Sequence, residues 1–75
     1  MGNENLNENL KEELITFINE HLDKKFVVQL LLLIGIFDDD TEMVQKALEH
    51  GADINRSMTN IERQILTEVG YVISV

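Results

Sequence analysis

The sequence predicts a single small all-α domain in which about four short helices form a compact bundle around a central helix hairpin. Three observations support this fold class. The 75 residues contain no proline, so nothing interrupts a helix. The apolar residues recur at helical spacing, and polar capping signals and glycines stand where helices should begin and end. We expect residues 1–75 to form one domain, with residues 1–7 frayed or disordered because they are rich in asparagine, a poor helix former.

The first predicted helix carries an amphipathic pattern over residues 6–22. Its apolar side chains recur three or four positions apart, which places them on one face, and the opposite face is mostly glutamate. The apolar face consists of Leu6, Leu10, Leu14, Phe17, Ile18 and Leu22. This face needs a cover, and only the next segment is apolar enough to supply it.

The most apolar segment is Phe26–Phe37, in which ten of twelve residues are large and apolar. A helix of this length spans about 18 Å, well short of a membrane core of about 30 Å, so we expect a buried core helix. Two arrangements are open. The other helices cover it on all sides, or one flank stays exposed and forms a homodimer or a partner interface. Gly35 either allows close contact with another helix or marks the end of this one.

Two capping signals mark the starts of the last two helices. Asp39 stands three residues before Glu42, which is an aspartate variant of the capping box. Thr59 stands three residues before Glu62, which is the usual form of the same motif. Gly51 is expected to end the third helix in the left-handed conformation that glycine adopts easily.

The last two helices also show which faces they should bury. The third is expected to bury Met43, Val44, Ala47 and Leu48, and the fourth Ile61, Ile65, Leu66 and Val69. Gly70 should end the fourth helix, and the apolar tail Tyr71–Val75 follows it. We expect this tail to pack back on the core rather than to act as an edge strand for a partner.

Residues Glu42 to Asn55, EMVQKALEHGADIN, resemble the second helix and outgoing turn of an ankyrin repeat. The shared pattern is an acidic residue, aliphatic positions along the helix and the ending Gly-Ala-Asp-aliphatic-Asn. Extending the register backward places Leu30–Ile36 where the first helix of the repeat lies, although four leucines replace the usual Thr-Pro-Leu-His start. The resemblance implies an ankyrin-like helix hairpin. The outer helices then act as unusual caps, or they enclose the hairpin in a small bundle.

The same resemblance has implications for individual residues and for function. It implies that Ile54 anchors the outgoing turn in the core and that Asp53 and Asn55 bind loop backbone groups. It also implies a non-catalytic protein–protein interaction module.

The charge of the chain restricts its partners. The formal net charge is −8, from fourteen acidic and six basic side chains. Direct nucleic-acid binding requires a basic surface, and anionic membranes repel an acidic one, so we expect neither partner. A basic protein would be attracted. The acidic residues that we expect to contact a protein partner, unless they serve only for solvation or helix capping, are Glu8, Glu12, Glu13, Asp38, Asp39 and Asp40.

The side chains that usually perform chemistry are scarce. There is no cysteine, and the two histidines, His21 and His50, lack the partner spacing of a zinc helix. Asp38, Asp40, Glu42 and Glu49 fit part of a calcium-loop frame, but Met43 stands where that loop needs glycine. We therefore expect no enzyme activity, no cofactor and no metal.

Three functions are compatible with these patterns. The first is the ankyrin-like protein-interaction module. The second is a small acidic inhibitor or immunity-type protein, of phage or bacterial origin, that blocks a basic or nucleic-acid-binding site on a target. The third is a structural subunit that associates with itself through Phe26–Phe37. The absence of cysteine and of a secretory pattern at the N-terminus predicts a cytoplasmic protein.

Overall fold

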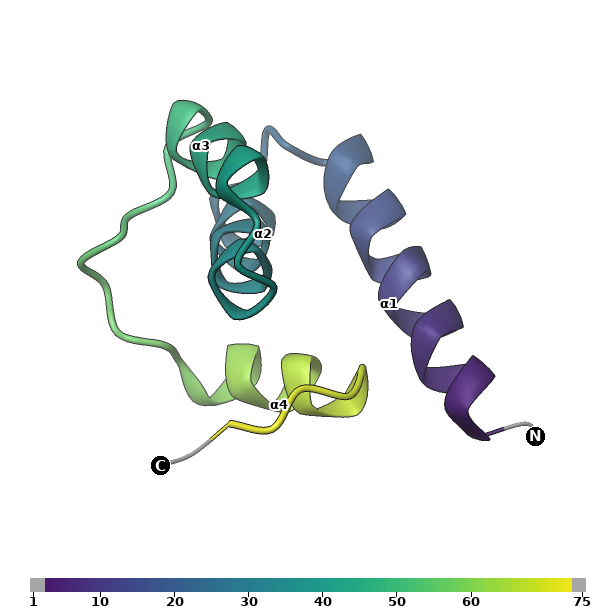
Figure 1. Ribbon diagram of the computed structural model, residues 1–75. Coiled ribbons are helices and arrows are strands. Elements are labelled where there is room, and N and C mark those ends of the chain that lie inside the picture. Colours follow the sequence, from purple (N-terminus) through teal and green to yellow (C-terminus); the bar gives the residue numbers. More distant parts are fainter. Residues whose placement is uncertain (1–2, 74–75) are drawn as a thin grey trace.

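The described residues form four α-helices, three of which pack around the second (Figure 1). The computed structural model describes the backbone of residues 3–73 and the side chains of residues 9–73. The all-α prediction with about four short helices is confirmed, and no strand occurs within residues 3–73. Residues 3–7 lie within the first helix, residues 1–2 lie outside the described residues, and the expected fraying of residues 1–7 stays a prediction. The helices are α1 (Asn3–Glu20), α2 (Lys25–Phe37), α3 (Thr41–Glu49) and α4 (Asn60–Glu68).

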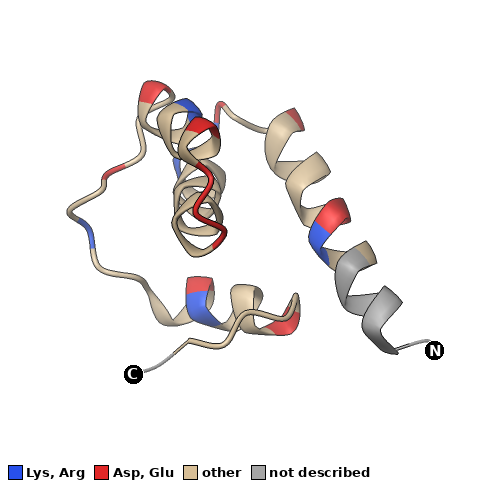
Figure 2. Cartoon of the chain, in the orientation of Figure 1, with Lys and Arg blue, Asp and Glu red and all other residues tan. Residues whose placement is uncertain are grey.

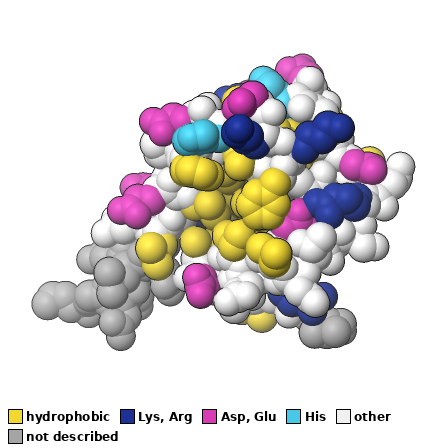
Figure 3. Space-filling view, turned by 180° about the vertical axis from the view of Figure 1, so that it is seen from behind, with side chains coloured by type: hydrophobic (Ala, Val, Ile, Leu, Met, Phe, Trp, Pro, Cys, Tyr) yellow, Lys and Arg dark blue, Asp and Glu magenta, His cyan; other side chains and the backbone are white. Residues whose placement is uncertain are grey.

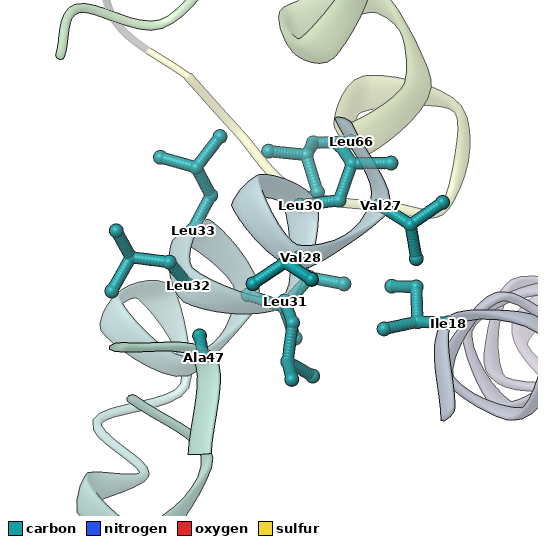
Figure 4. Packing of buried hydrophobic residues seen from close by; sticks show 10 residues of the cluster. Ile18, Val27, Val28, Leu30, Leu31, Leu32, Leu33, Ala47 and Leu66 are labelled. Atoms are coloured by element: carbon teal, nitrogen blue, oxygen red, sulfur yellow. The ribbon is translucent and has the colours of Figure 1, made fainter. Parts of the chain in front are cut away.

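Helix α2 is the centre of the fold. Its residues 27–35 are all buried. A helix that is apolar on every side requires neighbours on every side, and the other three helices supply them. Each neighbour contributes one side chain that is 0% exposed: Ile18 from α1, Ala47 from α3 and Leu66 from α4. Figure 4 shows these three around Val28, Leu31 and Leu30 of α2. Only the ends of α2 are therefore left for any contact outside the chain.

Helix α1 buries less of its predicted face than expected. Ile18 is fully buried, and Leu14 and Leu22 are partly buried against the core. Leu10 and Phe17, which the pattern assigned to the same face, are 44% and 48% exposed. Leu6, the first residue of the predicted face, lies outside the described side chains.

In the turn between α2 and α3, the aspartate that caps α3 is not the one that the sequence predicts. The Asp40 N–H donates to Gly35 O (2.8 Å) and the Asp39 N–H to Ile36 O (3.2 Å), which is a Schellman ending. Asp39 has a φ of +56°, so it takes the left-handed position that usually holds glycine. The prediction of Asp39 as the cap of α3 is therefore wrong. Asp40 caps the helix instead, accepting from the Met43 N–H at 3.2 Å.

The connection from α3 to α4 is fixed by a buried glutamine. Gln29, 5% exposed, donates from Nε2 to Asp53 O (2.9 Å) and accepts from the Asp53 N–H (3.0 Å). This pairing gives an amide inside an apolar helix the partners it needs. Asp53 also accepts from the Asn55 N–H at 2.9 Å, as the ankyrin resemblance implies. Ile54 does not anchor the turn, since it is 58% exposed.

Helix α4 begins with the predicted capping box but turns a different face inward. The Glu62 N–H donates to Thr59 Oγ1 (3.2 Å) and the Thr59 N–H to Glu62 Oε1 (2.9 Å). The Glu62 side chain is 1% exposed and also pairs with Arg56. Adjacent helix residues point about 100° apart, so burying Glu62 turns Ile61 outward. The prediction that Ile61 is buried is wrong, because its side chain is 63% exposed.

The segment after α4 packs back on the core as predicted, as far as residue 73. Gly70, at a φ of +110°, ends the helix, and Tyr71 and Ile73 pack against the buried cluster. Ser74 and Val75 lie outside the described residues. The Tyr71 hydroxyl donates to Asp38 Oδ1 (2.9 Å), and Lys11 Nζ lies 2.7 Å from Asp38 Oδ2. This cluster joins α1, the end of α2 and the C-terminal segment.

We expect this cluster to lose its stabilising effect at alkaline pH. The hydrogen bond to Asp38 raises the pKa of Lys11 above its usual 10.5, and burial raises the pKa of Tyr71 above 10.0. Both groups hold their protons more firmly when folded, so their contribution is complete below about pH 10 and falls as the pH rises through the raised values. Urea unfolding at increasing pH should show this decline.

A Tyr71→Phe variant provides the control for this decline. It should lose about 1 kcal/mol at neutral pH, the usual net value of one hydrogen bond, and it should decline less steeply above pH 10 than the natural sequence. Because Tyr71 is the only tyrosine, tyrosinate absorbance reports its titration directly. An equally steep decline in the variant would contradict this role for Tyr71.

Candidate protein-binding site

The acidic residues predicted to contact a partner occupy two separate elements, α1 and the α2–α3 turn (Figure 2). Asp38 is occupied by Lys11 and Tyr71, and Asp40 caps α3, so both have structural roles. The carboxylates of Glu12, Glu13 and Asp39 make no hydrogen bond or ion pair with any side chain that the structure describes. The Glu8 side chain lies outside that part.

Glu12 and Glu13 belong to a shallow hollow on the outer face of α1. The hollow has a volume of about 450 Å³, and Phe17 lies within it, 48% exposed. The ring of Phe17 stacks on His21 with centroids 4.2 Å apart. We call this surface the acidic α1 face; it is lined by Asn9, Glu12, Glu13, Thr16, Phe17 and Glu20.

A larger hollow lies where the start of α2, the α3–α4 connection and the start of α4 meet. Its volume is about 600 Å³, within the range of known ligand pockets. Phe26, 47% exposed, and Ile61, 63% exposed, provide its apolar surface. We call it the Phe26 groove; it is lined by Lys25, Phe26, Gln29, Gly51, Asp53, Arg56, Thr59, Ile61 and Glu62.

The face of the molecule opposite to the view of Figure 1 carries a continuous apolar area (Figure 3). Hydrophobic side chains gather at its centre, and lysine and arginine side chains border it on one side. The start of α2 lies on this face, since its other end, with the aspartate turn, points toward the viewer in Figure 2. Apolar side chains that escape burial in so small a domain are typical of a contact surface.

Buried polar contacts hold the walls of the Phe26 groove in place. The Gln29 amide ties Asp53 of the connection to α2, and the Arg56–Glu62 pair ties the connection to α4. The sequence patterns did not identify Gln29 or Arg56 as part of a site. The available signals were a single amide inside a buried helix, which must find a partner, and a basic residue six positions before Glu62.

The start of α2 departs from the usual chemistry of a helix N-terminus. Lys24 is the N-cap residue and makes no capping hydrogen bond, and the first turn contains no acidic side chain. Helices α3 and α4, by contrast, both have a side-chain cap and a glutamate in the first turn. A lysine at the positive end of the helix dipole is unfavourable. Lys24 and Lys25 are both exposed and make no ion pair with any described side chain.

We expect Lys24→Asp to stabilise the fold. The backbone of Lys24 is already extended (φ −99°, ψ 121°), as an N-cap requires, so an aspartate there can accept from a free N–H of the first turn. It would also place negative charge at the positive end of the dipole. The expected gain is about 1 kcal/mol, measured by urea unfolding. Lys24→Glu makes the same charge change at the same position, and glutamate is not a favoured N-cap residue, so an equal gain there would contradict capping as the cause.

The two histidines lie at helix ends. His21 and His50 each place Nδ1 near a carbonyl of their own helix end, Phe17 O at 2.8 Å and Lys46 O at 2.9 Å. Among the described residues, no three acidic, histidine or cysteine side chains come together as metal ligands. Within the same residues, no helix is both long and apolar enough to cross a membrane.

Comparison with known proteins finds no matching family model, no matching curated protein and no matching solved structure.

Proposed function

We propose that this chain is a non-catalytic protein-binding module and that its partner binds in the Phe26 groove. The observation that carries this proposal is the exposure of Phe26 and Ile61, at 47% and 63%, across one hollow. Burying an apolar side chain of this size is worth about 1.5–3 kcal/mol. Other large apolar side chains are also exposed, but Phe26 and Ile61 are the two that line this hollow. An aromatic and an aliphatic side chain in a concave setting are typical anchors of a protein interface.

The ankyrin resemblance supports the same class of function. The α2–α3 hairpin lies where the resemblance implies a helix pair, and Gly51, at a φ of +101°, ends α3 in the left-handed conformation. The outgoing turn is fixed by Gln29 and forms one wall of the groove. In this proposal the ankyrin-like ending serves to position the connection that shapes the groove.

The test compares replacements inside and outside the groove. Ile61→Ser and Val72→Ser both remove an exposed apolar side chain, 63% and 92% exposed, and both should leave the free energy of unfolding nearly unchanged. Proteins that co-purify with the tagged chain should be lost with Ile61→Ser and kept with Val72→Ser. Equal recovery with both variants would contradict binding at the groove.

The acidic α1 face supports a second candidate function, the acidic inhibitor of a basic site. Its specific support is the exposed Phe17 ring in a hollow bordered by Glu12, Glu13 and Glu20. An apolar anchor inside an acidic rim suits a basic partner. Binding of this kind should weaken steeply with salt, whereas binding through the Phe26 groove should change little. A double variant, Glu12→Gln with Glu13→Gln, should weaken binding through the acidic α1 face and should leave binding through the Phe26 groove unchanged.

Self-association remains a third proposal, with less surface to support it. Residues 27–35 of α2 are buried within the chain, so a homodimer through Phe26–Phe37 would have only the exposed ends, Phe26, Ile36 and Phe37. Measuring the solution mass over a dilution series tests it. A dimer that persists on dilution would favour this function over the other two.

A further inference from the structure

We propose that the acidic α1 face binds an arginine side chain of a protein partner. This inference rests on the second candidate function and specifies its partner. It states that the guanidinium group of the arginine lies on the open part of the Phe17 ring, with a glutamate carboxylate on either side of it along the helix.

The first support is the sign of the charge in the hollow. Three of its six lining residues are glutamates, Glu12, Glu13 and Glu20, and none is a lysine or an arginine. The Phe26 groove, by contrast, is lined by two basic and two acidic side chains and favours neither sign. At physiological ionic strength, charges more than about 8 Å away are largely screened, so an incoming group responds to the local charge. The acidic α1 face therefore favours a cation.

The lysines that belong to α1 or contact it have other partners. Lys11 Nζ lies 2.7 Å from Asp38 Oδ2, and Lys46 Nζ donates to Asn19 Oδ1 at 2.7 Å. Among the described side chains, no ion pair includes a glutamate of the hollow. Helix α1 also has no basic residue in its last turn, so the negative end of its dipole adds to the charge of Glu20. A cation of the partner would meet both.

The second support is the aromatic ring in the hollow. Phe17 is 48% exposed, and His21 stacks on one side of its ring with the two ring planes 28° apart. An incoming group therefore meets the part of the ring that His21 leaves open. Glu13 lies four residues before Phe17 and Glu20 three residues after it, which places both carboxylates one helical turn away on the same face.

This combination favours a guanidinium over an ammonium group. A guanidinium is planar, stacks on aromatic rings and donates two N–H groups to a carboxylate at once. An ammonium is compact and more strongly hydrated, so it would pair with the glutamates but gain less from the ring. The Phe17 ring thus allows the acidic α1 face to distinguish arginine from lysine, which glutamates alone would not do.

The experiment uses three unstructured peptides of one sequence that carry arginine, lysine or citrulline at the same positions. Citrulline has nearly the shape of arginine without its charge. Each peptide is titrated into the ¹⁵N-labelled full chain, and amide shifts locate the binding surface. The arginine peptide should shift the amides of Glu13, Phe17 and Glu20 and should bind about two- to fivefold more tightly than the lysine peptide, as one exposed cation–π contact allows. The citrulline peptide should cause no measurable shift.

Two phenylalanine variants test the role of the ring. Phe17→Leu keeps an apolar side chain at a half-exposed position, so its melting temperature should change little, and the arginine and lysine peptides should then bind equally. Phe26→Leu makes the same change at a residue that is 47% exposed in the Phe26 groove, and it should leave the preference for arginine unchanged.

Two glutamate variants test the role of the charge. Glu13→Gln should weaken the arginine and the lysine peptide alike, about threefold, because it removes one exposed charge pair. Glu49→Gln removes the same charge from an exposed position on α3, outside the hollow, and should alter the binding of neither peptide.

The other outcomes separate the inference from the second candidate function. Equal binding of the arginine and lysine peptides at the acidic α1 face would overturn the choice of arginine and leave the face as a site for basic partners. A preference for arginine that survives Phe17→Leu would overturn the contact with the ring. Equal binding of the citrulline peptide, shifts confined to the Phe26 groove, or no binding of any peptide would overturn both the inference and the second candidate function.

Discussion

Replacing Arg56 by methionine is expected to lower the free energy of unfolding by about 2–3 kcal/mol. The Glu62 carboxylate is 1% exposed, and Arg56 is its only cationic partner among the described residues. Methionine keeps much of the volume of the arginine but leaves a buried carboxylate unpaired. Breaking a fully buried pair costs about 3–5 kcal/mol, and the 37% exposure of the Arg56 side chain reduces that figure.

A double variant distinguishes the charge from the packing. Glu62→Gln removes the charge but keeps an oxygen that can accept from the Thr59 N–H, so Arg56→Met with Glu62→Gln should recover most of the lost stability. Urea unfolding of the two single variants and the double variant measures this coupling. Additive losses would show that the ion pair is not the reason for the effect of Arg56→Met.

Gly35→Ala is expected to destabilise the fold by about 2 kcal/mol, although alanine favours a helix over glycine by about 1 kcal/mol. A Cβ at residue 35 would lie 2.8 Å from Val44 Cγ2, 3.0 Å from Val44 N and 3.3 Å from Asp40 O. The first of these atoms can move with its side chain. The other two are backbone atoms of α3 and of its N-cap residue, so the start of the helix itself must shift away from α2.

The Val44→Ala background tests this explanation of Gly35. It removes the closest atom but not the backbone contact, so adding Gly35→Ala there should cost less than in the natural sequence and should still destabilise. Thermal unfolding of the four variants in this cycle gives the comparison. A gain of stability for Gly35→Ala in the natural sequence would contradict the close packing of α2 and α3.

Local chemistry predicts most of the fold. The apolar run predicts α2, the Thr59–Glu62 capping box predicts the start of α4, and Gly51 and Gly70 mark two helix ends, because each signal acts within a few residues. For Gly35 the sequence allows either a close helix contact or a helix end. The structure assigns the contact, since α2 continues to Phe37.

The errors arise where one residue has two possible uses. Asp39 and Asp40 can both cap α3, and the sequence does not show that the end of α2 takes Asp39 for its left-handed position. Ile61 and Glu62 differ by one helix position, and hydrophobicity favours Ile61 for the core. The Arg56 side chain reverses this choice, because it gives the Glu62 carboxylate a partner inside the protein.

The candidate site was less predictable than the fold. The acidic residues were chosen from composition, and two of them, Asp38 and Asp40, have structural contacts that sequence spacing does not reveal. The Phe26 groove combines the start of α2, the connection and the start of α4, which only tertiary packing brings together. Its exposed anchor Ile61 was expected in the core, so no sequence pattern identified this surface.

Site-specific photo-crosslinking tests the central claim most directly. A photoreactive amino acid replaces Ile61 in the Phe26 groove, Glu13 on the acidic α1 face, or Val72 outside both, in the full chain expressed in cells. We predict that position 61 crosslinks to another protein and that position 72 does not. Crosslinking from position 13 alone would place the contact on the acidic face and would contradict the Phe26 groove as the binding site.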